Sequence, residues 1–142
     1  MLRLVQAFIL SVSVFFMFEA GHAQSVAPQW VDGAQTVTLE QAKILHDKGV
    51  IFIDLRSEED YAKGHIALAI NQNIAGSFDR NTIARLVEKD EPVVFYCYGI
   101  KCLRSYTASI RAVSWGYQKV KYFRVGLPAW EKAGYPIETG KE

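Results

Sequence analysis

The sequence predicts an α/β fold in which a central parallel sheet is flanked by helices on both faces. Two observations predict it. Short runs rich in β-branched and aromatic residues alternate with segments of helical periodicity. Several of these runs are continuously apolar, which is typical of strands that are covered on both faces. In such sheets ligands bind at the carboxyl ends of the strands, so the residues that follow each strand are the first candidates for a site.

The strands are expected where the apolar runs occur, at residues 50–53, 92–96 and 120–123, with a weaker candidate at 66–70. The helices are expected after Thr38 (ended by Gly49), from Ser57 to Gly64, after Asp79 or Asn81, at 105–115 and at 128–133. Thr38 and Gln41 fit a capping box at the start of the first helix. The helix at 105–115 is indicated by apolar residues at helical spacing: Tyr106, Ile110, Val113 and Tyr117.

The chain has 142 residues, about one domain's worth, and its formal net charge is only +1. This balance argues against a nucleic-acid binder that relies on bulk charge. The chain holds two cysteines, which excludes a disulfide-dense scaffold.

The N-terminus is expected to be a signal peptide over residues 1–23. A cationic start precedes the uncharged run 4–18, which is shorter than the roughly 20 residues that a membrane-spanning helix needs. Gly21 and Ala23 have the small-residue spacing of a cleavage site. An uncleaved membrane anchor is the alternative. Cleavage would leave a lead-in over 24–36 and a domain over 37–138, periplasmic or secreted, with no stable membrane span.

The candidate site begins at Cys97, directly after the expected strand 92–96. The loop that follows leads into a helix N-terminus, whose N–H groups and positive dipole end favour a thiolate and bind anions. Lys101 and Arg104 add positive charge, and an arginine can hold an oxyanion with two hydrogen bonds. The pattern indicates a cysteine nucleophile that faces an anionic substrate. The alternative is a buried cysteine that only fills space.

Short segments along the chain resemble a single rhodanese-like domain. They occur in the family's order from about residue 37 to residue 136: 52–56, 59–61, 64–66, 69–71, 94–97, 104–105, 115–117 and 125–130. Each segment alone is weak evidence, whereas the set is specific.

The resemblance implies sulfur transfer without a metal or an organic cofactor. Cys97 would take a sulfane sulfur from a small anionic donor such as thiosulfate, form a persulfide and pass the sulfur to a thiol or protein acceptor. Asp54 and Arg56 match a pair of supporting residues. The loop residues expected to bind the substrate are Tyr98, Gly99, Ile100, Lys101, Cys102, Leu103 and Arg104.

The loop departs from the family pattern in length. Arg104 follows Cys97 by seven positions, whereas a common rhodanese loop has a step of five and related phosphatases have a step of six. A larger pocket, an altered substrate and a lost standard activity are all consistent with this difference.

Cys102 is the second departure. It could be a resolving thiol that forms a disulfide with Cys97, which a periplasmic thiol reductant would reopen. It could instead be the acceptor or nucleophile itself, or a passive loop residue. The alternative functions are therefore thiol-disulfide redox chemistry, less favoured phosphatase or arsenate reductase activity, and a non-catalytic sulfur carrier or binding module.

The remaining candidates have simpler interpretations. His65 is expected to bond free carbonyls at a helix end, and His46 is expected to be solvated. Tyr98 could line the pocket mouth or be an exposed loop aromatic. The other expectations are structural, with capping charge at Glu58, Glu59 and Asp60 and core packing at Trp115 and Trp130.

Overall fold

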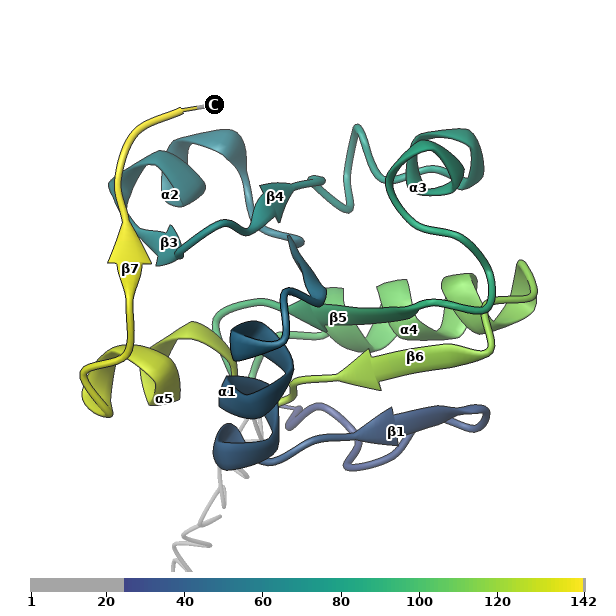
Figure 1. Cartoon of the computed structure of the whole chain (residues 1–142), viewed down its shortest axis with the longest axis horizontal. Helices are drawn as coiled ribbons and strands as arrows, with labels where there is room; N and C mark the ends of the chain where they lie inside the picture. Colours follow the sequence, from purple (N-terminus) through teal and green to yellow (C-terminus); the bar gives the residue numbers. More distant parts are fainter. Residues whose placement is uncertain (1–24, 142) are drawn as a thin grey trace, which may run out of the picture.

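A computed structural model describes residues 25–141. Five parallel strands form the central sheet in the order β1-β6-β5-β2-β4, so β5 is the middle strand (Figure 1). The short strands β3 and β7 form a separate antiparallel pair. The elements are β1 (Ala34–Thr36), α1 (Leu39–Asp47), β2 (Ile51–Asp54), α2 (Glu58–Lys63), β3 (His65–Ile66), β4 (Ile70–Asn71), α3 (Arg80–Leu86), β5 (Pro92–Tyr96), α4 (Arg104–Ser114), β6 (Lys119–Tyr122), α5 (Gly126–Lys132) and β7 (Ile137–Glu138).

The sheet separates two apolar cores, because successive side chains of a strand point to opposite faces. In β5, Val93 and Phe95 pack with residues of α3 and α4, and Cys97 after the strand joins that same core. Val94 and Tyr96 point to the other face, where they pack with residues of α1 and α5. Both faces of the sheet are therefore covered by helices, which confirms the predicted fold class (Figure 1).

Side-chain caps start the first three helices, as their sequences predict. Thr38 and Gln41 form the capping box of α1. The hydroxyl of Ser57 accepts the amide N–H of Asp60 at the start of α2. Asp79 caps α3, so of the two starts considered for that helix the earlier one is observed.

The core-facing side of α4 consists of small residues. The helix lies where it was predicted, but its buried residues are Ser105, Ala108, Ser109 and Ala112. Small side chains allow the helix axis to approach the sheet closely. Ile110, one of the apolar residues at helical spacing, is therefore turned outward and is 44% exposed.

Two of the observed strands, β1 and β7, were not predicted, and one weakly predicted strand is observed as two short strands. β1 lies within the segment 24–36 that was expected to be a lead-in, and it pairs along its length with β6. β7 pairs with β3. The candidate strand at 66–70 is interrupted at Leu68, which has φ +64° and turns the chain between β3 and β4.

The expected signal peptide, residues 1–23, lies outside the described residues. Among the helices of residues 25–141, none is both long enough and apolar enough to cross a membrane.

Candidate active site

Cys97 lies at the carboxyl end of the middle strand and is 1% exposed. Its carbonyl accepts a hydrogen bond from the amide of Leu127 in the first turn of α5, at 3.0 Å. The neighbouring Gly126 has φ +59°, and a Cβ atom at this position would collide with the Cys97 carbonyl oxygen. Only glycine allows α5 to begin so close to the end of β5. The backbone of Cys97 is thus fixed by a strand on one side and a helix on the other.

A disulfide joins Cys97 to Cys102, with the two Cα atoms 6.5 Å apart. The residues 97–103 between the strand and α4 are called the cysteine loop below. Within it, the amide of Cys102 donates to the carbonyl of Gly99 at 2.9 Å, and Gly99 has φ +124°. The structure therefore brings together the two cysteines on which the sequence analysis focused.

The cysteine loop ends at a helix N-terminus that has no side-chain cap. α4 begins at Arg104, and Leu103 at its N-cap position makes no side-chain hydrogen bond to the first turn. The first N–H groups of a helix have no partner within the helix and lie at the positive end of its dipole. The loop therefore faces a positive potential from the backbone, to which the Arg104 guanidinium adds a full charge.

Tyr98 is held in place by the neighbouring helix α2. Its hydroxyl donates a hydrogen bond to the carboxylate of Asp60. Its ring centroid lies 5.2 Å from the guanidinium carbon of Arg56 and 5.8 Å from that of Arg104. Burial of the phenol and the hydrogen bond to Asp60 raise the pKa of Tyr98 above its usual value. Although Tyr98 is 42% exposed, its position is therefore determined by three charged side chains.

Asp54 and Arg56 form a buried ion pair at the end of β2. Arg56 Nη2 and Asp54 Oδ2 are 2.6 Å apart, and Nε of the guanidinium contacts both carboxylate oxygens. The same Nη2 donates to the carbonyl of Gly64 at 2.7 Å, which fixes the turn after α2. Burial works to lower the pKa of Arg56, but the hydrogen bonds and charge of Asp54 outweigh it and raise that pKa. Both charged groups are used in contacts within the fold, as is typical of supporting residues.

The N-terminal strap, residues 27–28, lies against the cysteine loop. The amide of Ala27 donates to the carbonyl of Ile100 at 2.7 Å. Arg124 returns two hydrogen bonds to the Ala27 carbonyl, from Nε at 2.9 Å and Nη2 at 2.8 Å. The Tyr122 hydroxyl donates to the carbonyl of Pro28 at 3.1 Å. Sequence reasoning missed this contact because it uses backbone atoms of a polar segment, which leave no pattern of side chains.

The other residues that were predicted to bind the substrate differ in exposure. Ile100, Lys101 and Leu103 are exposed, whereas Gly99 is buried. Arg104 is partly buried, and within residues 25–141 its Nη1 atom has no hydrogen-bond partner. Across the same residues, no three histidine, cysteine or acidic side chains come together in a way that could hold a metal ion.

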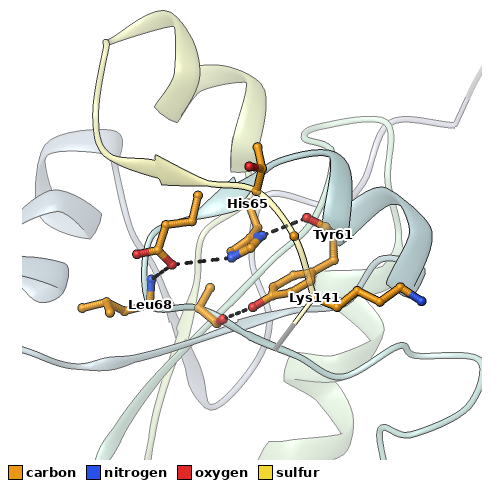
Figure 2. Close-up of a pocket in the computed structure, with 8 residues that line it drawn as sticks. Tyr61, His65, Leu68 and Lys141 are labelled. Carbon is orange, nitrogen blue, oxygen red and sulfur yellow. Dashed lines mark hydrogen bonds and ion pairs between the residues drawn. The ribbon is translucent and has the colours of Figure 1, made fainter.

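A separate pocket of about 330 Å³, whose lining includes no residue of the cysteine loop, lies between α2 and the C-terminal segment (Figure 2). His65 lies at its wall, with Nδ1 2.8 Å from the Tyr61 carbonyl and its ring stacked on the Tyr61 ring. On its other side Nε2 is 3.7 Å from Glu138, which also accepts the amide of Leu68 (Figure 2). These contacts confirm the interpretation of His65 as a structural residue at a helix end.

The prediction that His46 is solvated is wrong. Its Nε2 atom lies 2.8 Å from the carbonyl of Ala67, and its side chain is only 12% exposed. Its ring contacts Phe52 and Trp130 edge to face. His46 thus links α1 to the aromatic core, which its position on a short helix did not indicate. Trp130 is fully buried, and Trp115 stacks on Phe78, so both tryptophans pack as predicted.

A family model and several known proteins match this chain. The family model for the rhodanese-like domain matches residues 38–133. A thiosulfate sulfurtransferase GlpE of Pseudomonas fluorescens is 30% identical over 105 residues, which cover 72% of this chain and 88% of that protein. The HTH-type transcriptional regulator Rv0324 of Mycobacterium tuberculosis is 33% identical over 119 residues, or 82% of this chain, and the match spans about half of the regulator (51%). Among solved structures, the BH2092 protein from Bacillus halodurans superposes with a TM-score of 0.67 at 26% identity, covering 74% of this chain and 77% of that one.

Proposed function

Because the chain belongs to the rhodanese-like domain family, we propose that it is a sulfurtransferase in which Cys97 carries the sulfur. The donor is a small anion with a sulfane sulfur, such as thiosulfate, and the acceptor is a thiol or another thiophilic group. The thiosulfate sulfurtransferase among its relatives supports this class of reaction.

One observation carries the proposal: Cys97 directly follows the middle strand of the sheet, and the loop it opens leads to the uncapped N-terminus of α4. Its sulfur atom is bonded to Cys102, two residues before the first residue of α4, so we infer that it lies near the positive end of this helix of 11 residues. The same potential stabilises a thiolate, a persulfide anion and an anionic donor. No other cysteine of the chain competes for the role except Cys102 in the same loop.

The proposed reaction has two steps. The Cys97 thiolate attacks the outer sulfur of thiosulfate, the S–S bond of the donor breaks, and sulfite leaves with the bonding electron pair. This leaves a persulfide on Cys97. The acceptor then attacks the outer sulfur of the persulfide and releases the Cys97 thiolate. Arg104 is positioned to attract the anionic donor, because it opens α4 and lies beside the loop.

The disulfide defines the resting form that has to be reduced before the first step. With Cys97 bonded to Cys102, the nucleophile is blocked. A thiol reductant therefore belongs to the proposed cycle. Disulfides form and persist in oxidising compartments, which supports the proposal that residues 1–23 direct export to the periplasm or the outside of the cell. The proposed mature chain then has its lead-in at 24–36 and its domain at 37–138.

The test is thiocyanate formation from thiosulfate and cyanide by the reduced protein, with the loop peptide analysed by mass spectrometry. We expect turnover by the native protein and one added sulfur on Cys97 in Cys102→Ser, and we expect Cys97→Ser to show neither turnover nor added sulfur. Cys102→Ser is the matched control, since it removes the other thiol of the same loop and should still take up sulfur. Absence of sulfur on Cys97 in both the native protein and Cys102→Ser would overturn the proposal.

The disulfide itself favours one second candidate, a thiol-disulfide redox protein that uses Cys97 and Cys102. The same experiment separates the two functions. A redox protein would reduce a disulfide substrate stoichiometrically and would take up no sulfur from thiosulfate.

A further inference from the structure

We propose that Cys102 resolves the Cys97 persulfide and releases its outer sulfur as sulfide, which makes the protein a dithiol-dependent, sulfide-releasing catalyst. This inference rests on the proposed function, since it requires a persulfide on Cys97. It deepens that function by adding a second route for the sulfur, which leaves as hydrogen sulfide when no acceptor takes it.

The fold of the cysteine loop brings the two sulfur atoms together. The 6.5 Å between the Cα atoms lies within the range of about 4.4–6.8 Å that disulfides require. Three backbone hydrogen bonds hold this arrangement: Leu127 to Cys97, Cys102 to Gly99 and Ala27 to Ile100. None of them involves a sulfur atom. We therefore expect the reduced loop to keep the thiol of Cys102 close to Cys97.

The contact between the two cysteines indicates which thiol can reach the inner sulfur of the persulfide. In the disulfide form Cys97 is 1% exposed and belongs to the core beneath α4, and the sulfur atom of Cys102 is the group in contact with its Sγ atom. Cys102 is partly buried and packs against the same core from inside the loop. Cys102 is therefore placed to attack the inner sulfur of the persulfide from within the loop.

The position of Cys102 also favours its reactive form. It lies two residues before the first residue of α4 and directly after Lys101. A helix N-terminus and a neighbouring cation both favour a thiolate over a thiol. The same charges stabilise the sulfide anion as it leaves.

The chemistry balances without an external oxidant. The Cys102 thiolate attacks the inner sulfur of the Cys97 persulfide, the bond between the inner and outer sulfurs breaks, and hydrosulfide leaves with the electron pair. The product is the Cys97–Cys102 disulfide. A dithiol reductant then attacks the more accessible Cys102 sulfur, the Cys97 thiolate leaves, and the second thiol of the reductant frees Cys102. The sum converts thiosulfate and a dithiol into sulfite, sulfide and a disulfide.

The test is a single turnover without any free thiol, because free thiols release sulfide from persulfides by themselves. The full protein is reduced, freed of reductant under anaerobic conditions and mixed with one equivalent of thiosulfate. We expect sulfite and sulfide in equal amounts, and the loop peptide with a Cys97–Cys102 disulfide. Cys102→Ser and Cys102→Ala should release the same sulfite, retain one sulfur on Cys97 and give sulfide only at background. Cyanide should then discharge that sulfur as thiocyanate.

Three results would overturn the inference. The native protein could keep the added sulfur on Cys97 without releasing sulfide, or the added sulfur could be found on Cys102. Sulfide release by the Cys102 variants at the native level would exclude Cys102 as the resolving thiol. The first and the third leave the proposed function intact, because sulfite is still formed and Cys97 still carries the sulfur. Sulfur on Cys102 would also overturn the role proposed for Cys97. Absence of sulfite from the native protein and from both variants would overturn the proposed function together with the inference.

Discussion

The phenol of Tyr98 in the cysteine loop is hydrogen-bonded to the carboxylate of Asp60 in α2, across 38 residues of sequence. Asp60 also accepts the Ser57 hydroxyl at 2.9 Å and lies 3.3 Å from the ammonium group of Lys63. The Tyr98 hydrogen bond is the largest cause that lowers the pKa of Asp60, to about 2 from an ordinary 3.8, and the Ser57 hydrogen bond is the next. The loop that holds the cysteines is thus tied to a carboxylate that stays ionised through the neutral range.

Replacing Tyr98 with phenylalanine should therefore raise the pKa of Asp60 toward 3.8, because the strongest donor to its ionised form is lost. The measurement is an NMR titration of the side-chain carboxyl groups in both proteins. Asp79 is the internal control, since backbone N–H groups at the start of α3 lower its pKa independently of Tyr98. An Asp60 titration that is the same in both proteins would show that the hydrogen bond is not made in solution.

The direction of the shift also sets the pH window of this contact. The pKa of Asp60 is lower in the folded protein than its ordinary value. The contribution of the ionised carboxylate to folding stability is therefore complete above pH 3.8 and is lost as the pH falls through about 2. In the folded native protein, the Tyr98 ring signals should therefore change as the pH passes through about 2, where Asp60 takes up its proton. In a variant with Asp60→Asn the same change should be absent.

Asp54→Ala should destabilise the protein by about 3–5 kcal/mol, because it leaves a buried guanidinium without its partner. The Arg56 side chain is only 4% exposed, so water cannot replace the lost carboxylate. Urea unfolding followed by circular dichroism gives the free energy of unfolding. Lys43→Ala breaks an exposed pair with Asp47 and should have a much smaller effect. Equal losses in the two variants would contradict the buried pair's role.

Gly126→Ala should damage the site more than Gly134→Ala, although both glycines have left-handed backbone angles of φ +59° and φ +71°. At Gly134 nothing lies within 4 Å of an added Cβ, so only the backbone strain of about 1–2 kcal/mol remains. At Gly126 the Cβ collides with the Cys97 carbonyl in addition to that strain. Unfolding free energy and sulfur uptake by Cys97 are the two measurements. A Gly126→Ala protein as stable and active as Gly134→Ala would contradict the close packing of α5 on β5.

Arg124→Ala should release the N-terminal strap. The variant loses two hydrogen bonds from a charged donor to the Ala27 carbonyl, and such bonds are worth about 1.5–3 kcal/mol each. Amide hydrogen exchange at Ala27 should become about tenfold faster or more. Lys121→Ala is the control, because Lys121 bonds the nearby Gln35 side chain and does not contact the strap. Unchanged protection of the Ala27 amide would show that the strap is held by other contacts.

The features that sequence reasoning predicted are those encoded by neighbouring residues. The capping box at Thr38, the cap at Ser57 and the order of strands and helices each depend on a few consecutive positions. Cys97 could be singled out because it directly follows a strongly apolar strand. The buried Asp54–Arg56 pair is also local, and its supporting role followed from a family resemblance.

The features that were missed depend on residues far apart in the sequence. β1 is a three-residue strand whose apolar signal is weak, and it is a strand only because β6 lies beside it. His46 is on a short helix, and only the three-dimensional structure brings it against Trp130. The contact between Tyr98 and Asp60 likewise has no local pattern. In each case the contact depends on a partner that is distant in the sequence, so the local residues alone do not indicate it.

The position of β1 and the strap has a consequence for how the chain is made. Both belong to the first described residues to leave the ribosome, yet their long-range partners are Ile100 and the β6 region through Arg124. A nascent chain shorter than 122 residues cannot complete the pairing of β1 with β6, and one shorter than 124 residues lacks the Arg124 hydrogen bonds to Ala27. The cysteine loop therefore acquires its final support near the end of synthesis, and a chain that stops early presents its cysteines without that support.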